Sequence, residues 1–241
     1  MYILLEYNKN YKENIKELKK YKLTPVVLFR LTLNNKNQIK TDLQKIKEIK
    51  SKINPKNSAV IITIEKLENS TIGTVNNLKL DFDIVIGLGG LNKINRFFLE
   101  STRVDFLQDP QNTYFKQKMD FIHHFNSGLN QVLCEYAKQK QIGYIFSLNF
   151  TTKNKRFVPK EIGRINQNLR FARKYKTPSI INFVIQNPSQ IKTQIELIGI
   201  MSLFDLSTQQ KQQSLKILEE KVKQNKFKKT DKHIAQGIEI I

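Results

Sequence analysis

Cysteine is nearly absent from the 241-residue chain, which contains only Cys134. A single cysteine cannot form an internal disulfide, so we expect a reducing compartment, the cytoplasm. Long apolar runs are absent as well, because no segment approaches the roughly 20 apolar residues that a membrane-spanning helix needs. The opening run, YILLEY at 2–7, is short and includes Glu6. We therefore expect neither a signal peptide nor a membrane-spanning segment, and we name no membrane among the expected partners.

The motifs of common metal sites do not occur. The chain has three histidines, His123, His124 and His233, and no H-x-H or H-E-x-x-H pattern. Adjacent histidines cannot place both rings on one face of a helix or strand, whereas a metal site needs ligands that converge on one ion. We therefore predict no metal ligands in this chain.

A glycine-rich stretch, GLGG at 87–90, follows an apolar run. It fits neither G-x-G-x-x-G nor G-x-x-x-x-G-K-[ST], the patterns of dinucleotide and triphosphate loops. Anion binding by backbone amides at the start of the next helix remains an alternative. We favour the simpler interpretation, in which the glycines form a tight turn between a strand and a helix.

Residues for acid/base catalysis are not indicated either. Barrel enzymes carry their active sites at the C-terminal ends of the strands, whereas Asp81 and Asp83 lie at the N-terminal end of their expected strand. Only Asp109 follows one, in DPQN, where an aspartate before proline most often shapes a turn. One carboxylate makes no acid/base pair. Cys134 lies among apolar helix residues, as a buried structural thiol does, so we predict no catalytic residue.

Acidic residues are scarce relative to basic ones. The chain has 41 Lys and Arg against 21 Asp and Glu, a formal net charge of +20 and a pI near 9.9. Such a surplus repels itself in a compact chain unless an anionic partner lies nearby. Nucleic acid is the commonest such partner, and an acidic membrane surface is the next. The alternative is a composition rich in Lys, Asn, Ile and Gln that merely reflects an AT-rich coding sequence; we favour a polyanionic partner.

The composition is otherwise that of a folded protein, with 39% apolar and 10% aromatic residues. Apolar runs alternate with stretches of helical periodicity along the whole chain. We expect strands at 2–7, 24–31, 58–64, 82–88, 104–107, 142–148 and 178–185, with GIEII at 237–241 as a further short one. We expect helices at 11–18, 39–53, 91–98, 129–137 with Ser127 as N-cap, 162–172, 188–198 opened by Pro188 and ended by Gly199, and 215–222. Residues 69–80 show no clear pattern.

Continuous apolar strands are buried on both faces, and their alternation with helices indicates parallel pairing. Seven or eight such units in fewer than 250 residues fit a TIM-like (β/α) barrel. A doubly wound open sheet is the alternative. No linker rich in Pro, Gly or Ser and no internal repeat occurs, so we predict a single α/β domain over 1–241 with a basic C-terminal segment at 221–241.

The basic residues gather in two segments. Residues 153–176 contain nine Lys or Arg and one acid, and a second basic cluster lies at 221–232. Phosphate neutralisation needs such clusters on one surface, and Phe157, Phe171 and Phe227 could stack on unpaired bases. Solvated helix faces with core phenylalanines are the alternative. Our candidates for RNA contacts are Arg96, Arg103, Lys153, Lys155, Arg156, Lys160, Arg164, Arg170, Arg173, Lys174, Lys226, Lys228 and Lys229.

The order of several segments is also informative. These are DIVIGLGGLNKINRFFLESTRVDFLQDP at 83–110, SGLNQVLCEYAKQKQIGYIFSLN at 127–149, the seventh strand with the helix opened by Pro188, and the terminal GIEII. Together they resemble ribonuclease P protein component 3, whose Asn-Arg pair has its counterpart in Asn95 and Arg96. The chain departs from that family in YILLEY for Y-D-L-x-V, in Gln131 for a common His, and in VIQNPS where S-G-A is usual.

The resemblance implies a TIM-like barrel that assists a catalytic RNA. In that family the RNA, with magnesium, removes the 5′ leader from precursor tRNA, and the protein pairs with ribonuclease P protein component 2 beside other subunits. We expect the same partners here, with precursor tRNA contacted indirectly, no cofactor bound by the chain itself and no catalysis by the chain alone. Two other hypotheses are a TIM-barrel metal-dependent phosphoesterase or hydrolase, and a barrel that only binds another protein.

Overall fold

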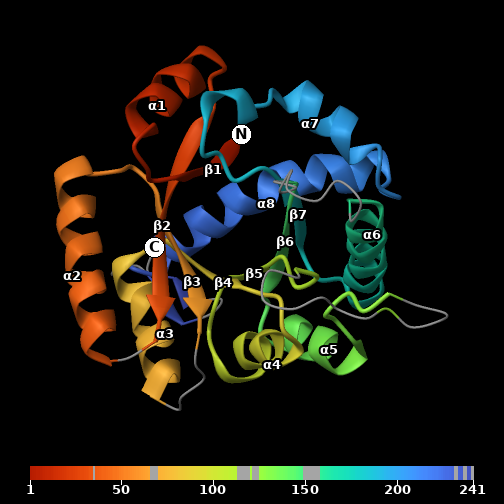
Figure 1. The fold of residues 1–241 in the computed structure, drawn as a ribbon, viewed down its shortest axis with the longest axis horizontal. Helices are drawn as coiled ribbons and strands as arrows, with labels where there is room; N and C mark the ends of the chain where they lie inside the picture. The colour runs from red at the N-terminus through yellow and green to blue at the C-terminus, as the bar shows by residue number, and fades with distance from the viewer. Residues whose placement is uncertain are drawn as a thin grey trace.

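The computed structural model describes residues 1–34, 36–65, 70–112, 120, 125–148, 158–230, 233–235 and 238–239. Within them, seven parallel strands follow one another in chain order around a barrel (Figure 1). They are β1 (Tyr2–Glu6), β2 (Thr24–Leu33), β3 (Ser58–Ile64), β4 (Ile84–Leu88), β5 (Phe106–Gln108), β6 (Gly143–Ser147) and β7 (Ser179–Asn182). The N–H of Ile185 donates to Leu4 O at 3.0 Å and the N–H of Glu6 donates to Ile185 O at 2.9 Å, which joins the chain after β7 to β1. The predicted TIM-like barrel is confirmed, and the sequential strand order excludes the doubly wound sheet.

Helices surround the barrel between successive strands (Figure 1). They are α1 (Tyr11–Lys20), α2 (Lys36–Ile53), α3 (Ser70–Asp81), α4 (Asn92–Arg96) with the π-helical turn η1 (Phe97–Ser101), α5 (Gln131–Gln139) and α6 (Val158–Tyr175). After β7 come the 3-10 turn η3 (Pro188–Gln190), α7 (Gln194–Met201) and α8 (Thr208–Phe227). In the part of the chain that the structure describes, no helix is both long and apolar enough to cross a membrane.

The strand side chains alternate between the inside of the barrel and the surrounding helices. On β1, Leu4 packs inward in one cluster with Leu28 and Ile86, while Ile3 packs outward in another cluster with Leu18 of α1. All five side chains are almost completely buried. The strand sequences are continuous apolar runs because both faces of the strands are covered.

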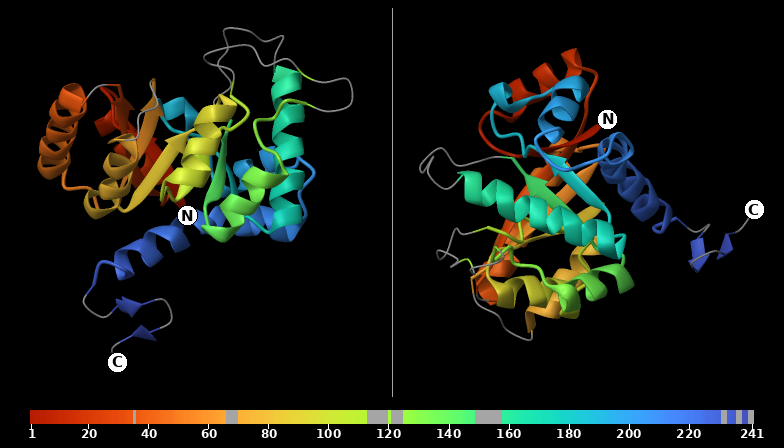
Figure 2. Two further views of the ribbon diagram at one scale, coloured as in Figure 1. Left: turned by 90° about the horizontal axis from the view of Figure 1, so that it is seen from below. Right: turned by 90° about the vertical axis from the view of Figure 1, so that its right-hand side faces the viewer.

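Helix α8 closes the end of the barrel at which the strands begin. Leu218 and Val222 of α8 belong to the same buried cluster as the inward-facing strand residues. Asn225 Nδ2 donates to the backbone oxygen of Asp83, just before β4, at 2.8 Å. Figure 2 shows α8 passing beneath the barrel and leading to two short antiparallel strands, β8 (His233–Ala235) and β9 (Ile238–Glu239). The strand expected in GIEII therefore exists, but it pairs with β8 and not with the barrel.

Among the turns from a helix to the next strand, three share both a left-handed residue that is not glycine and the same backbone hydrogen bond. Lys22, Gln141 and Lys176 have φ values of 54°, 54° and 55°. After each, the next N–H donates to a carbonyl five residues earlier, as from Leu23 to Leu18 at 3.1 Å. These Schellman arrangements end α1, α5 and α6 without the glycine that usually marks such a helix end in a sequence.

The start of α5 differs from the prediction. Asn130, and not Ser127, is the N-cap, and its side chain accepts a hydrogen bond from the Leu133 N–H at 2.9 Å. The hydroxyl of Ser127 is instead bound by Gln167 Nε2 of α6 at 2.9 Å. The cap prediction is wrong because a contact distant in sequence holds the serine side chain outside the helix.

The helix expected over 188–198 is interrupted. Its first turn is the separate 3-10 turn η3, and α7 begins anew after Thr193, whose side chain forms a capping box with Glu196. Gly199 lies inside α7 and does not end it. A strong cap at Thr193 starts a new helix because it satisfies amide groups that a continuous helix would bond internally.

Candidate nucleic-acid interface

The GLGG turn is packed too closely to receive a ligand. A side chain at Gly89 would lie 2.9 Å from the Cα of Pro110, and Gly90 has a φ of 144°. The N–H of Gly90 donates to Asn95 Oδ1 at 2.9 Å. The glycines therefore allow close approach and a positive φ, which confirms the interpretation as a turn.

The C-terminal ends of the strands, where barrel enzymes carry their active sites, surround a cavity of about 310 Å³. Glu6 on β1 accepts hydrogen bonds there from Arg30 Nε at 3.1 Å and from Gln186 Nε2 at 2.7 Å. The sequence analysis did not single out these three side chains, because they come together only when the barrel closes. Both oxygens of this carboxylate are engaged.

Asp109 is the second carboxylate of this cavity. It has a left-handed φ of 49°, which fits the predicted turn. Its carboxylate accepts from the N–H of Ser147 at 2.7 Å, from the Ser147 hydroxyl, and from Gln108 and Gln111 Nε2 at 3.2 Å each. Burial raises the pKa of Asp109, and these hydrogen bonds oppose the rise. Asp109 thus ties β5 to β6.

The hydrolase alternative needs histidines and carboxylates that converge on one ion. Among the described residues no group of three His, Cys, Asp or Glu side chains could hold a metal. His233 lies in β8, whereas His123 and His124 lie outside the described residues. The geometry of the described part therefore gives this alternative no support.

Cys134 is completely buried, and the Tyr144 hydroxyl lies 3.8 Å from its Sγ. Burial raises the pKa of the thiol to about 11. A thiol with so high a pKa is a poor nucleophile near neutral pH. This fits the predicted structural role.

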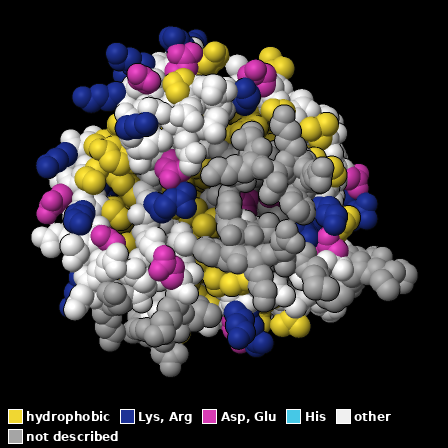
Figure 3. All heavy atoms as spheres, in the orientation of Figure 1, with side chains coloured by type: hydrophobic (Ala, Val, Ile, Leu, Met, Phe, Trp, Pro, Cys, Tyr) yellow, Lys and Arg dark blue, Asp and Glu magenta, His cyan; other side chains and the backbone are white. Residues whose placement is uncertain are grey.

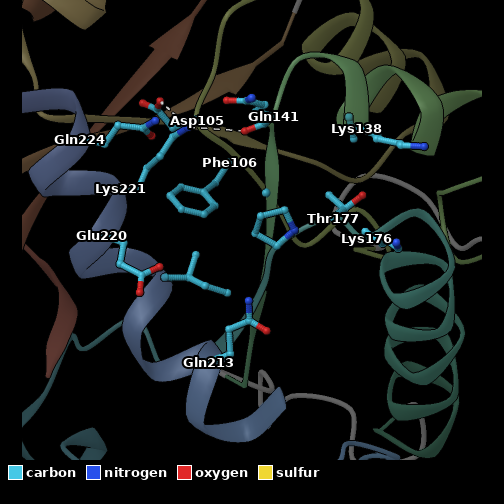
Figure 4. A pocket seen from close by; sticks show the side chains of 14 residues that line it. Asp105, Phe106, Lys138, Gln141, Lys176, Thr177, Gln213, Glu220, Lys221 and Gln224 are labelled. Carbon is cyan, nitrogen blue, oxygen red and sulfur yellow. Dashed lines mark hydrogen bonds and ion pairs between the residues drawn. The ribbon is translucent and has the colours of Figure 1, made fainter. Parts of the chain in front are cut away.

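At the opposite end of the barrel, Asp105 anchors two lysines. Its carboxylate accepts from the Val85 N–H at 2.9 Å and from Lys79 Nζ at 3.0 Å, and lies 3.8 Å from Lys221 Nζ. A cavity of about 530 Å³ lies beside it, lined by α8 and by residues at the ends of α5 and α6. Figure 4 shows Lys221 extending from α8 toward Asp105, with Gln141 beside them. Lys221 is thus directed into the protein.

Two of the C-terminal RNA candidates also make contacts within the protein. Lys226 Nζ donates to the Lys56 carbonyl and to Asn57 Oδ1, the latter at 2.9 Å. Lys229 Nζ donates to the Phe82 carbonyl at 2.9 Å. The third, Lys228, is exposed. Lys226 and Lys229 therefore hold α8 against the loops before β3 and β4.

The candidates on α6 divide into one buried and four exposed residues. Arg164 is 6% exposed and donates to Asp120 Oδ1 from Nε at 3.0 Å and from Nη2 at 2.9 Å. The exposed ones are Lys160, Arg170, Arg173 and Lys174, and Arg173 forms an ion pair with Asp205 at 3.1 Å. The outer surface of α6 therefore has several cations, while Arg164 serves a structural contact.

The remaining candidates lie near α4 or outside the described residues. Arg96 is exposed and hydrogen-bonds Glu100, and the exposed Arg103 follows η1. On the face drawn in Figure 3, Lys and Arg side chains of the described residues are scattered and do not form one patch. Three candidates belong to a segment outside the described residues: Lys153, Lys155 and Arg156.

A third cavity, of about 720 Å³, lies between α4, residues 125–130, α5 and α6. We call it the α4–α6 groove. Two of the aromatic residues in it are Phe125, which is 38% exposed, and Phe171. The sequence analysis named Phe171 but missed Phe125, because the residue that positions it, Gln167, lies 42 positions further along the chain.

Comparisons with known proteins identify relatives of this fold. No model of a known protein family matches the chain. Ribonuclease P protein component 3 of Methanosarcina barkeri is 22% identical over 180 residues, which is 74% of this chain and 70% of the relative. That of Methanosarcina acetivorans is 26% identical over 175 residues, 72% of this chain and 66% of the relative. The resemblance to ribonuclease P protein component 3 is confirmed.

Solved structures share the fold of this chain. A chain in the cryo-EM structure of archaeal ribonuclease P with mature tRNA matches with a TM-score of 0.74 and 21% identity, covering 100% of this chain and 98% of that chain. An Arabidopsis N6-mAMP deaminase matches with a TM-score of 0.54 and 10% identity, covering 85% of this chain and 58% of that chain. At these identities both matches show a shared barrel fold.

Proposed function

We propose that the chain is a protein subunit of ribonuclease P, the ribonucleoprotein endoribonuclease that removes the 5′ leader from precursor tRNA. The observation that carries the proposal is the similarity of about three quarters of the chain, 74%, to ribonuclease P protein component 3. The barrel supports it, because its match to a chain of archaeal ribonuclease P extends over the full length of the protein.

In this proposal the chain acts through charge and is not catalytic by itself. Lysine and arginine side chains neutralise phosphates of the RNA and release condensed counterions, so that RNA helices can pack together. The exposed cations of α6, Lys160, Arg170 and Lys174 among them, are the first choice for this role. The magnesium ions of the reaction are held by the RNA, and the chain works in the cytoplasm beside ribonuclease P protein component 2 and other subunits.

A salt series tests the electrostatic mechanism. The affinity of the chain for ribonuclease P RNA should fall steeply as salt rises, with a slope of roughly −0.9 per neutralised phosphate. Replacing Lys160, Arg170 and Lys174 together by Gln should make that slope shallower by about two to three units. A response to salt that is flat in the unmodified protein would contradict the proposal.

The matched control is a triple substitution on the other side of the barrel. Lys40, Lys45 and Lys52 are exposed on α2, which lies across the barrel from α6 (Figure 1). Replacing these three lysines by Gln removes the same charge as the α6 substitutions, but the salt slope should remain equal to that of the unmodified protein within experimental error. Equal losses from α2 and α6 would show that only net charge matters and that α6 is not the interface.

The proposed protein partner has its own test. Affinity purification of the tagged full chain should recover ribonuclease P RNA and ribonuclease P protein component 2, and nuclease treatment should leave component 2 attached. Recovery of component 2 only through RNA would contradict direct pairing while leaving the RNA-binding role in place.

A further inference from the structure

Phe125, in the α4–α6 groove, is held in a fixed position at the surface. Its N–H donates to Gln167 Oε1 at 3.0 Å, and its carbonyl oxygen accepts from Gln167 Nε2 at 2.8 Å. One amide side chain of α6 thus binds both polar backbone groups of this residue. Phe125 as a whole is 38% exposed. The two hydrogen bonds from Gln167 therefore fix a partly exposed aromatic residue in place before any partner binds.

A glycine in α6 makes room for this ring. A side-chain carbon at Gly163 would lie 2.7 Å from Phe125 Cε2 and 2.8 Å from Cζ. Glycine inside a helix costs roughly 0.5–1 kcal/mol relative to alanine. The position of Phe125 therefore explains why residue 163 is glycine. α6 contains a residue of low helix propensity there, and this leaves space for the ring of Phe125.

The remaining lining of the groove has the chemistry that an unpaired nucleotide requires. Asn92 and Gln131 are exposed amide side chains, which offer both donors and acceptors to base edges. Lys93 and Arg96 supply positive charge at the α4 side, and no Asp or Glu belongs to the described lining. Glu100 hydrogen-bonds Arg96, so Lys93 is the stronger source of positive potential.

We propose that the α4–α6 groove binds an unpaired nucleotide of the RNA, with its base stacked on Phe125 and its phosphate near Lys93. Sequence-independent recognition of single strands combines a cationic groove with aromatic rings in this way. The inference deepens the proposed function and rests on it. It assigns to the groove a contact that depends on stacking, in addition to the charge-dependent contacts of α6.

Substitutions at Phe125 separate stacking from charge. Phe125→Ala should weaken binding of the full chain to ribonuclease P RNA about 5- to 150-fold, which corresponds to the 1–3 kcal/mol that stacking contributes per base. The salt slope should stay unchanged, because no charge is removed. Tyr21→Ala, which truncates an exposed aromatic residue just after α1, is the matched control and should leave affinity unchanged.

Two conservative variants keep the test decisive if alanine disturbs the fold. Phe125→Trp preserves an aromatic face and should retain most of the affinity, whereas Phe125→Leu preserves apolar bulk and should lose as much as alanine. With a short single-stranded oligoadenylate as probe, Phe125→Leu should bind more weakly than the unmodified protein. With an RNA duplex of the same length, the two proteins should bind equally.

The possible outcomes distinguish this inference from the function on which it rests. If the unmodified protein does not bind ribonuclease P RNA, the proposed function itself fails. If it binds and Phe125→Leu binds equally well, the stacking site is wrong and the proposed function stands. If Phe125→Leu keeps its RNA affinity but no longer binds component 2 without RNA, the groove is a protein interface, which also overturns the inference.

Discussion

Replacing Asn95 by Ala should strongly destabilise the protein. Asn95 is completely buried, and its side chain joins three loops. Oδ1 accepts from the Gly90 N–H at 2.9 Å, and Nδ2 donates to Pro110 O at 3.0 Å and to Gly128 O at 2.9 Å. One amide therefore connects the GLGG turn, the chain after β5 and the chain before α5.

The magnitude follows from the three lost hydrogen bonds. Each contributes about 0.5–1.5 kcal/mol net, and a buried partner left without a bond costs about 1–3 kcal/mol. Some loss is recovered if water enters the space, so we expect Asn95→Ala to lower the free energy of unfolding by about 3–5 kcal/mol. That is a large share of the 5–15 kcal/mol by which typical domains are stable.

Urea unfolding followed by far-UV circular dichroism measures this loss. Asn95→Asp tests the assignment of the two ends of the side chain, because it keeps an acceptor for Gly90 but sets an oxygen against the Pro110 and Gly128 carbonyls. It should destabilise at least as much as alanine. Asn92→Ala, at an exposed position of the same helix, should change stability by less than about 0.5 kcal/mol. A loss below about 1 kcal/mol for Asn95→Ala would refute the reasoning.

Three further predictions concern single residues. Lys22→Gly should raise the free energy of unfolding by about 0.5–1 kcal/mol in the same assay, because relief of the left-handed φ of 54° exceeds the entropic cost of glycine; a loss of stability would contradict this. Burial raises the pKa of Asp109, so the folded protein binds the carboxyl proton of Asp109 more tightly than the unfolded chain does. The free energy of unfolding, relative to that of Asp109→Asn, should therefore fall as pH rises from about 4. A difference in urea midpoint between the two proteins that stays constant up to about pH 7 would rule this out. Burial raises the pKa of Cys134 to about 11, so the folded protein should react with Ellman's reagent near pH 8 far more slowly than in denaturant, whereas equal rates would disprove the buried position.

The barrel could be predicted because its strands carry their own signal. Runs such as TPVVLFRL and SAVIITI are mostly apolar and contain several β-branched residues, since most positions on both faces of β2 and β3 are covered. α3 carried no such signal. Thr71, Gly73 and Asn76 are poor helix formers, and the helix forms where Val75 and Leu78 pack into the core. The helical structure of this segment therefore depends on tertiary contacts, which a local sequence pattern does not contain.

The candidate interface was less predictable than the fold. Composition indicated a polyanionic partner, but it could not separate exposed cations from those already bound within the protein. Arg164 and Lys160 are four positions apart on one helix, yet the first is buried against Asp120 and the second is exposed. The position of Phe125 depends on Gln167 and Gly163 of a helix that follows much later in the chain, so its place in a groove could not be read from neighbouring residues.

The basic residues of α8 and α6 illustrate why net charge alone does not locate an interface. Lys226 and Lys229 donate to backbone carbonyls at the closed end of the barrel. Removing either lysine deprives a backbone carbonyl of this donor, and the cost appears in stability. Lys160 and Lys174 lie on the outer face of α6, where their removal changes the field around the protein and leaves the core intact. Lysine thus has two roles in this protein. Where its ammonium group donates to a backbone carbonyl it stabilises the fold, and where the ammonium group faces solvent it contributes to the surface potential.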